Sequence, residues 1–304
     1  MENIEKQLRL GIIGISEGNG HPYSWSAIFN GYDPEAMQKC PFPVIPEYLS
    51  KQTFPDDAIP DARVTHLWTQ DNEISKHIAA SCLIDTVVEN YQDMIGEVDA
   101  VLLARDDPEN HKEMSRPFLE ADLPIYIDKP LALSVAEAEN IYSYQKYDSQ
   151  IFTCSALRFA DEFNPKKIDI GSLGKLKSIT ATIMKDWQKY GVHIIDPVLN
   201  IIGDQGCIKN VEATQDIDIR NVNINWESGL VTNFITTGSN QSNLEIKIDG
   251  TNGSKIILFN DTFAAFKNCL QAFIKTIRTN ESLPQESVLK VIEVIEKGEQ
   301  CVPV

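Results

Sequence analysis

A lysine between an acid and a proline follows a short apolar stretch near the middle of the chain, at Asp128-Lys129-Pro130. The stretch at 125–127 is expected to be a buried strand, and ligands of open α/β sheets bind at the carboxyl ends of such strands. Pro130 disfavours a helical backbone at Lys129 and so restricts it. A lysine partly removed from water can take part in proton transfer. The stretch therefore predicts either a catalytic lysine or an ordinary strand end with a solvated Asp–Lys pair.

A second candidate site follows the apolar segment 10–15, which is expected to be another buried strand. A glycine-rich turn comes next, and then His21-Pro22, which suits the first turn of a helix. A strand, a glycine-rich turn and a helix cradle the pyrophosphate in dinucleotide folds, through free backbone N–H groups and the helix dipole. The residues expected to contact a cofactor here are Gly14, Ser16, Glu17, Gly18, Asn19 and Gly20.

The glycine fingerprint of this turn is incomplete. In the G-x-G-x-x-G frame that starts at Gly14, Ser16 and Asn19 occupy the second and third glycine positions. An ordinary strand-to-helix turn therefore stays open as the alternative.

Two polar residues follow the next predicted strand, residues 62–68, where a dinucleotide fold often carries an acid that binds the adenosine ribose. Thr69 and Asp71 are alternatives for this place, because the register is open. No Arg or Lys is close enough to suggest a pocket for a 2′-phosphate. NAD is therefore favoured over NADP.

The first half of the chain alternates predicted strands with predicted helices, which is typical of a parallel sheet. Asp107 is expected to cap one helix, with Pro108 at its first position. Ser134 and Glu137 form a capping box for another. The remaining elements expected in this half are strands at 86–88, 99–104, 125–127 and 150–154 and a helix at 72–81.

After residue 156 the pattern changes to alternating polar and apolar residues, typical of antiparallel strands with one buried face. The strands expected there are 175–183, 210–219, 230–237, 244–249 and 255–260, followed by helices at 262–278 and 284–297. The fold class is therefore α/β. An N-terminal Rossmann doubly wound parallel sheet (1–130) precedes a C-terminal α+β domain with a mainly antiparallel sheet (131–304).

The segment 32–61 holds six of the fifteen prolines and shows little periodicity. Long irregular connections in compact domains are often lids or binding loops. The segment is expected to be either an ordered flap beside the site or a surface excursion with short helical turns near 35–39 and 47–51.

Charge and cysteine usage exclude several classes of function. The 304 residues carry 44 acids against 27 bases, and a net charge of -17 disfavours nucleic acid and anionic membranes as partners. The six cysteines form no CxxC pair and have no histidine at metal-ligand spacing, so reduced thiols, a cytoplasmic location and no metal site are expected. The polar N-terminus does not resemble an export signal, and no apolar run is long enough to span a membrane.

Three motifs follow one another with a specific order and spacing. Asp107-Pro108-Glu109-Asn110-His111 follows the fourth strand and Asp128-Lys129-Pro130 the fifth. Gly191-Val192-His193-Ile194-Ile195-Asp196 lies on a predicted helix of the second half, and Leu199 and Gly203 continue its pattern. Together they resemble the Gfo/Idh/MocA family of NAD(P)-dependent oxidoreductases, which includes glucose-fructose oxidoreductase and inositol dehydrogenase. The resemblance covers nearly the whole chain.

The resemblance implies roles for several residues. Lys129 would hydrogen-bond the reacting hydroxyl or carbonyl, after a cis peptide to Pro130, and His193 would be the general acid/base. Hydride would pass between the substrate carbon and the nicotinamide. Asp196 would either orient the imidazole or cap or pair elsewhere. The cofactor contacts would also include Asp107, His111, Asp128 and Lys129.

The chain departs from the family pattern in the second half as well. Lys189 stands where the family has an acid, four residues before the histidine, which would disfavour a protonated His193 and favour an anionic substrate. Alternatively, Tyr190 takes over a proton-transfer or hydrogen-bonding role. Arg158 either borders the substrate pocket or pairs with Asp161 or Glu162. A smaller departure is Asp128 in place of the usual glutamate.

These features predict an NAD(P)-dependent oxidoreductase that transfers hydride at a secondary alcohol or ketone of a sugar, sugar nucleotide or cyclitol. A homodimer or homotetramer through the C-terminal sheet is expected from the resemblance. Two alternatives stay open. One is an epimerase or lyase that works through a transient ketone, and the other is a cofactor-binding sensor without net redox activity.

Overall fold

The computed structural model describes residues 6–301 and divides the chain into two compact units. Unit 1 holds the residues up to 131 together with 140–153 and 270–283, and unit 2 holds 132–139, 154–269 and the residues from 284 on. Each unit is therefore assembled from several stretches of the chain. The division into domains at residue 130 stays a prediction.

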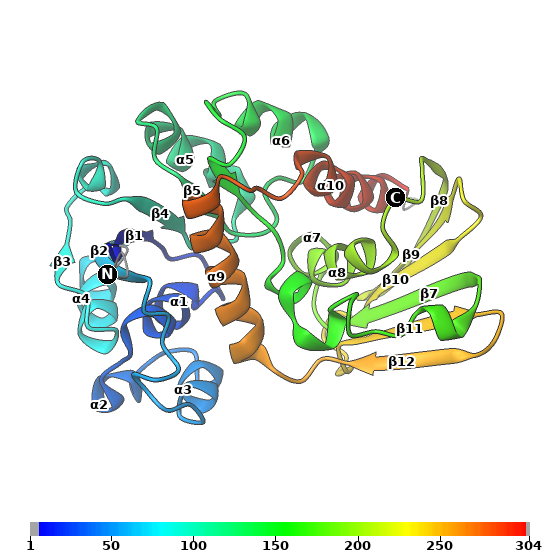
Figure 1. Cartoon of the computed structure of the whole chain (residues 1–304), viewed down its shortest axis with the longest axis horizontal. Helices are drawn as coiled ribbons and strands as arrows, with labels where there is room; N and C mark the ends of the chain where they lie inside the picture. The colour runs from blue at the N-terminus through cyan, green and yellow to red at the C-terminus, as the bar shows by residue number, and fades with distance from the viewer. Residues whose placement is uncertain (1–5, 302–304) are drawn as a thin grey trace, which may run out of the picture. The chain divides into compact units, whose positions relative to one another are not determined.

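Unit 1 is built on a six-stranded sheet whose neighbouring strands are all parallel (Figure 1). The strand order is β3-β2-β1-β4-β5-β6, so the order reverses between β1 and β4, and ligands of such sheets bind at this switch point. The predicted Rossmann-type sheet is confirmed. Its strands are β1 (Leu8–Ile13), β2 (Ala62–Trp68), β3 (Thr86–Val87), β4 (Ala100–Leu103), β5 (Ile125–Ile127) and β6 (Ile151–Phe152).

The helices of unit 1 begin where the sequence supplies a cap or a proline. Asp71 caps α4, because its carboxylate accepts hydrogen bonds from the backbone N–H groups of Glu73 and Ile74. Pro22 lies in the first turn of α1. The helices are α1 (His21–Asn30), α2 (Pro34–Met37), α3 (Val44–Leu49), α4 (Asn72–Ser81) and α5 (His111–Glu120), while α6 (Val135–Tyr142) and α9 (Thr262–Thr279) contain residues of both units.

The proline-rich segment 32–61 contains the short helices α2 and α3, as one of the two sequence-based alternatives predicts. Met37, Ile45 and Leu49 are buried, so the segment packs onto the rest of the unit. A side chain on Gly20 would lie 2.5 Å from Ile45, which shows how closely the segment approaches the turn before α1.

Unit 2 holds a second six-stranded sheet, of order β12-β11-β7-β10-β9-β8. The mainly antiparallel character is confirmed, with β7 and β10 as the parallel pair. The strands are β7 (Leu176–Ile183), β8 (Ile208–Asp216), β9 (Ile219–Trp226), β10 (Val231–Thr236), β11 (Glu245–Gly250) and β12 (Ser254–Leu258).

The strand expected at 210–219 is present as β8 but ends at Asp216, because the chain turns at residues 217 and 218 before β9 begins. Ile217 adopts a positive φ of 51°, which is unusual for a β-branched residue. Without an Asn-Gly or similar signal, the sequence does not announce this hairpin.

Three helices of unit 2, α7 (Trp187–Tyr190), α8 (Val192–Ile202) and α10 (Gln285–Gln300), contribute to its core. Val198 and Ile295 pack in one buried cluster with Val222 of β9 and Phe234 of β10. Alternate residues of these strands are buried, as expected for a sheet with one covered face.

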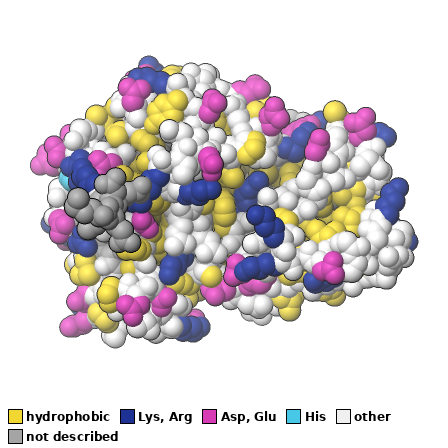
Figure 2. Space-filling view, viewed as in Figure 1, with side chains coloured by type: hydrophobic (Ala, Val, Ile, Leu, Met, Phe, Trp, Pro, Cys, Tyr) yellow, Lys and Arg dark blue, Asp and Glu magenta, His cyan; other side chains and the backbone are white. Residues whose placement is uncertain are grey.

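On the face shown in Figure 2, acidic and basic side chains are interspersed. Within residues 6–301, no helix is both long and apolar enough to cross a membrane.

Candidate functional site

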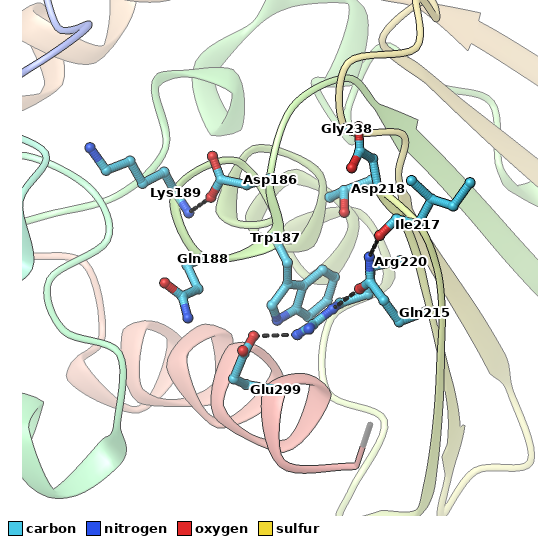
Figure 3. Close-up of a pocket in the computed structure, with 11 residues that line it drawn as sticks. Asp186, Trp187, Gln188, Lys189, Gln215, Ile217, Asp218, Arg220, Gly238 and Glu299 are labelled. Atoms are coloured by element: carbon cyan, nitrogen blue, oxygen red, sulfur yellow. Dashed lines mark hydrogen bonds and ion pairs between the residues drawn. The ribbon is translucent and has the colours of Figure 1, made fainter. Parts of the chain in front are cut away.

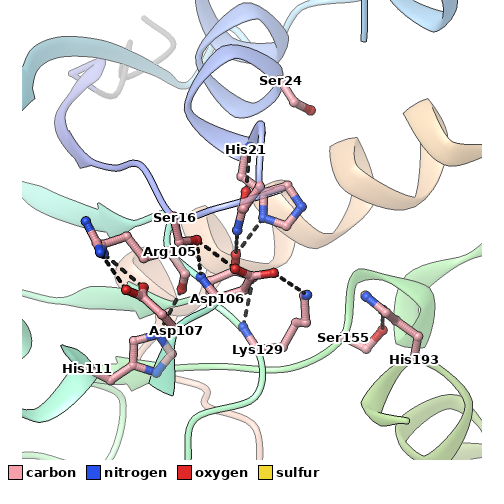
Figure 4. A network of polar contacts seen from close by, with 12 residues as sticks. Ser16, His21, Ser24, Arg105, Asp106, Asp107, His111, Lys129, Ser155 and His193 are labelled. Atoms are coloured by element: carbon pink, nitrogen blue, oxygen red, sulfur yellow. Dashed lines mark hydrogen bonds and ion pairs between the residues drawn. The ribbon is translucent and has the colours of Figure 1, made fainter. Parts of the chain in front are cut away.

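Lys129 lies two residues beyond the end of β5 and is buried, with 4% of its surface exposed. Its Nζ is 3.5 Å from Oδ2 of Asp106, which lies beyond the end of β4 and is also buried. Oδ1 of Asp106 accepts a hydrogen bond of 2.6 Å from the hydroxyl of Ser16, beyond the end of β1 (Figure 4). The ends of three neighbouring strands are therefore joined by one polar chain. The peptide between Lys129 and Pro130 is cis, as the resemblance implies.

Asp128 is fully buried and accepts hydrogen bonds from three groups. Its Oδ2 lies 2.8 Å from Nδ2 of Asn19 and 2.6 Å from Nδ1 of His21, and its Oδ1 accepts from the backbone N–H of Lys129 at 2.8 Å. Burial alone would raise the pKa of Asp128, but the contacts with His21 and Lys129 lower it to about 2. Because an ionised carboxylate only accepts hydrogen bonds, the proton of this contact resides on Nδ1 of His21.

The ring of His21 is further held by aromatic stacking. It stacks on Trp25 with ring centroids 4.8 Å apart, and Trp25 stacks on Tyr126 of β5 at 4.7 Å. Sequence reasoning assigned His21 only to the start of a helix. Its partner Asp128 lies 107 residues away, so no local pattern announces the pair.

The turn between β1 and α1 fits a pyrophosphate group through its backbone. Within residues 6–301, the backbone N–H groups of Ser16, Glu17 and Gly18 have no hydrogen-bond partner. Gly18 has a positive φ of 77°, and the space around its Cα is open. These donors would hold the phosphates of a dinucleotide.

The start of α1 contributes less to this cradle than the sequence predicts. The backbone N–H of His21 donates to Oδ1 of Asn19, and those of Tyr23 and Ser24 both point to the carbonyl of Gly20. The donors open to a phosphate therefore come from the turn itself rather than from the first turn of the helix.

Gln70 and Arg105 border the same turn, and sequence reasoning missed both. The amide of Gln70 accepts from the backbone N–H of Ile15 at 3.0 Å and donates to its carbonyl at 2.7 Å. Arg105 donates to Oε1 of Gln70 and forms a two-pronged ion pair with Asp107, at 2.9 and 2.5 Å. Burial would raise the pKa of Asp107, but Arg105 lowers it below its usual value.

Asp107 occupies the predicted N-cap position before Pro108, but its side chain does not cap the helix. Its carboxylate accepts from Arg105 and from the side chain of Asn110, and makes no capping hydrogen bond to the backbone. A short 3-10 turn, Pro108–Asn110, precedes α5. The carboxylate is held instead by Arg105, two residues earlier in the same loop after β4.

The other predicted cofactor residues of unit 1 carry internal hydrogen bonds. The hydroxyl of Thr69 donates to the carbonyl of Asp71 at 2.6 Å, and Asp71 is the exposed cap of α4. His111 is fully buried, with Nδ1 3.0 Å from the carbonyl of Leu131 and Nε2 2.8 Å from that of Arg105. His111 thereby fastens the segment after Lys129 to the end of β4.

In unit 2, Nδ1 of His193 on α8 lies 2.8 Å from the hydroxyl of Ser155. Asp196 accepts the backbone N–H of Ser155 at 2.8 Å and pairs with Arg158 at 2.7 Å. The structure therefore favours the alternative in which Asp196 pairs elsewhere over the one in which it orients His193. Arg158 pairs with Asp196, and the predicted partners Asp161 and Glu162 were wrong.

The hydroxyl of Tyr190 contacts the side-chain amine of Lys185. Nζ of Lys185 lies 2.5 Å from that oxygen, and the ring of Tyr190 is 5.7 Å from that of His193. Lys185 has a positive φ of 76°, and its backbone pairs with Gly238. Sequence reasoning proposed a role for Tyr190 but missed Lys185.

Lys189, the predicted anion-binding residue, borders a pocket of about 710 Å³ in unit 2 (Figure 3). Its side chain extends away from Trp187 and Arg220, while its backbone N–H donates to Asp186. The pocket also contains the ion pair of Arg220 with Glu299. Three acids and two bases line it, so the pocket is not built for an anion alone.

The residues 48–155 match the family described as "Oxidoreductase family, NAD-binding Rossmann fold" (Gfo/Idh/MocA). No curated protein sequence matches the chain.

Solved structures share the fold over nearly the whole chain. Myo-inositol 2-dehydrogenase from Lactobacillus plantarum is 16% identical, with a TM-score of 0.73 and 97% of each chain covered. Scyllo-inositol dehydrogenase from Lactobacillus casei with bound NAD(H) and scyllo-inositol is 15% identical, with a TM-score of 0.74 over 98% of this chain and 97% of that one. A myo-inositol dehydrogenase from Corynebacterium glutamicum is 13% identical, with a TM-score of 0.71 and the same coverage. The family match covers the first two of the three motifs, at 107–111 and 128–130, and the solved structures show that their fold extends over the rest of the chain.

Proposed function

We propose, from its likeness to the Gfo/Idh/MocA oxidoreductases, that this protein binds NAD and transfers hydride at a secondary alcohol or ketone of a cyclitol, sugar or sugar nucleotide. The observation that carries the proposal is the position of Lys129. Its buried amine lies beside Asp106 at the carboxyl edge of the parallel sheet. Asp106 accepts a hydrogen bond from Ser16 of the glycine-rich turn, and this turn carries the backbone N–H groups that have no partner in the described chain.

The bound dinucleotide would supply the hydride chemistry, and the chain's own residues would manage binding and protons. Backbone donors of residues 16–18 would hold the pyrophosphate, and Asp71 would contact the adenosine ribose from the end of β2. Lys129 would hydrogen-bond the reacting oxygen, and His193 would accept or return its proton. Within unit 2, Ser155 orients His193, which supports this role.

NAD is the proposed cofactor because the end of β2 presents an acid, Asp71, and an amide, Gln70, where a 2′-phosphate would need a cation. Arg105 is engaged with Asp107. NADP is the less favoured cofactor. A cytoplasmic location and a homodimer or homotetramer through the second sheet complete the proposal.

The first test is binding of NADH and NADPH, followed by fluorescence, since Trp25 stacks on His21 close to the turn. NADH is expected to bind more tightly than NADPH. Absence of binding by both would refute the proposal.

The second test is turnover of NAD with a panel of inositols and sugar nucleotides, compared between the wild type and Lys129→Ala. Loss of a positioned proton-handling group is expected to lower turnover by about 100-fold or more. A protein that binds NADH but turns over no substrate of the panel, with or without Lys129, would instead support the sensor alternative.

A further inference from the structure

The two residues that break the glycine fingerprint both donate hydrogen bonds from their side chains to the carboxylates beside Lys129. Ser16 donates to Asp106 at 2.6 Å, and Asn19 donates to Asp128 at 2.8 Å. Ser16 and Asn19 are both buried. A glycine at either position would remove a donor from a buried carboxylate, which costs the desolvation of that oxygen.

We propose that Ser16 and Asn19 are positioning residues that couple the dinucleotide-binding turn to Lys129. The inference rests on the proposed function, because it takes this turn as the place where the cofactor's phosphates bind. It adds that the two residues that replace glycines of the fingerprint position Lys129.

The coupling has two arms, which hold different parts of Lys129. One arm runs from the Ser16 hydroxyl through Asp106 to Nζ of the lysine. The other runs from the Asn19 amide through Asp128 to the lysine's backbone N–H. The side chain and the backbone of Lys129 are thus fixed from the same turn.

Hydrogen bonds within the turn link Ser16 to Asn19, so a shift of the turn would move both arms together. The backbone N–H of Asn19 donates to the carbonyl of Ser16 at 3.1 Å. Oδ1 of Asn19 accepts the backbone N–H of His21, which in turn contacts Asp128 through its ring. A phosphate that settles on the turn would therefore also order the carboxylates that flank the lysine.

The two side chains leave the phosphate donors of the turn untouched. The Ser16 side chain is directed to Asp106 (Figure 4) and that of Asn19 to Asp128, while the backbone N–H groups of Ser16, Glu17 and Gly18 have no partner within residues 6–301. Substituting the glycines of the fingerprint has therefore not removed the means of binding a phosphate.

The test restores the fingerprint with Ser16→Gly and Asn19→Gly and measures two properties. NADH affinity is measured by fluorescence, and the acylation rate of Lys129 in the ligand-free protein by peptide mass spectrometry at fixed pH. NADH affinity is expected to stay within about threefold of the wild type. Lys129 is expected to be acylated about fivefold faster, which corresponds to the loss of one ordinary hydrogen bond.

Two further variants distinguish positioning from a general loss of structure. Ser16→Thr keeps the hydroxyl and is expected to retain the wild-type acylation rate. Ser26→Ala, a buried serine of α1 whose hydroxyl has no partner in the described chain, is the matched control and should change neither property. If the glycine variants do not fold, Asp106→Asn replaces them, with the same expected rise in acylation.

The inference is wrong if the glycine variants leave the acylation of Lys129 unchanged. It is also wrong if they abolish NADH binding, because Ser16 and Asn19 would then serve binding itself. Failure of the wild type to bind either dinucleotide would refute the proposed function instead. The acylation comparison does not depend on that result, so the two failures are distinguishable.

Discussion

The hydroxyl of Ser155 lies 2.8 Å from Nδ1 of His193, while its backbone N–H donates to the carboxylate of Asp196. Ser155 thus forms hydrogen bonds with both polar residues of the α8 motif, His193 and Asp196. Asp196 is paired with Arg158, while the imidazole of His193 contacts the Ser155 hydroxyl.

Substituting Ser155 by alanine should lower turnover more than cofactor affinity. A catalytic group that loses its orientation costs about 10- to 100-fold in rate. Turnover of NAD with the substrate found by the inositol and sugar nucleotide panel should fall by that factor, with the NADH dissociation constant unchanged. Ser155→Thr retains the hydroxyl and should recover most of the rate, and the exposed Ser172→Ala is the control. Full activity in Ser155→Ala would rule out this orienting role.

The buried ion pair of Arg158 with Asp196 should be essential for the stability of unit 2. Burial lowers the pKa of Arg158, but Asp196 raises it above its usual value overall. Arg158→Met leaves a buried carboxylate without its cation, which should lower the free energy of unfolding by about 3–5 kcal/mol in urea titrations. The exposed pair of Lys167 with Asp161 supplies the control, because Lys167→Met should cost less than about 1 kcal/mol. Equal losses in the two variants would contradict this account.

The sheets could be predicted from the sequence because their buried strands repeat a simple pattern. The strand β2, the strand β5 and the helix α4 have the predicted bounds residue for residue. The strand β9 was missed because the turn before it is made by Ile217 in a conformation that its type disfavours. Local pattern fails where tertiary structure imposes the backbone.

The members of the candidate site that were predictable are those that lie within a recognisable local motif. Lys129 was found because it follows an apolar strand and precedes a proline. Asp106 and His21 were missed, since the order of strands in the sheet brings them to this place. Ser155 was missed for the related reason that its partner His193 lies 38 residues away.

The ionised state of Asp128 should make the stability of the protein depend on pH in acid. The pKa of Asp128 is about 2 in the folded protein and about 4 in an unfolded chain. Its contribution, about 2–3 kcal/mol, is present above the unfolded value and is lost as the pH falls from about 4 through 2. Urea unfolding of the wild type and Asp128→Asn measures it. The stability difference between them should shrink over that range, and a constant difference would show that Asp128 does not titrate this way.

Gly14 should be intolerant of any side chain because α1 approaches β1 closely at this point. A Cβ on Gly14 would lie 2.2 Å from Cγ of Pro22, a rigid ring in the first turn of α1. Gly14→Ala should therefore lower the free energy of unfolding by about 1–3 kcal/mol, the usual cost of overpacking. At Gly171 the nearest atom to a Cβ is 3.8 Å away, so Gly171→Ala should change stability by less than about 0.5 kcal/mol.

A second substitution separates the Gly14 clash from other effects of the alanine. Pro22→Ala removes the ring atoms that the new methyl group meets, so the double variant should be more stable than the sum of the two single losses predicts. Additive losses would show that the cost of Gly14→Ala lies in the backbone of the turn rather than in its contact with α1. Since the turn also carries the N–H groups proposed to bind phosphate, Gly14→Ala should weaken NADH binding as well, and the affinity should recover together with stability in the double variant.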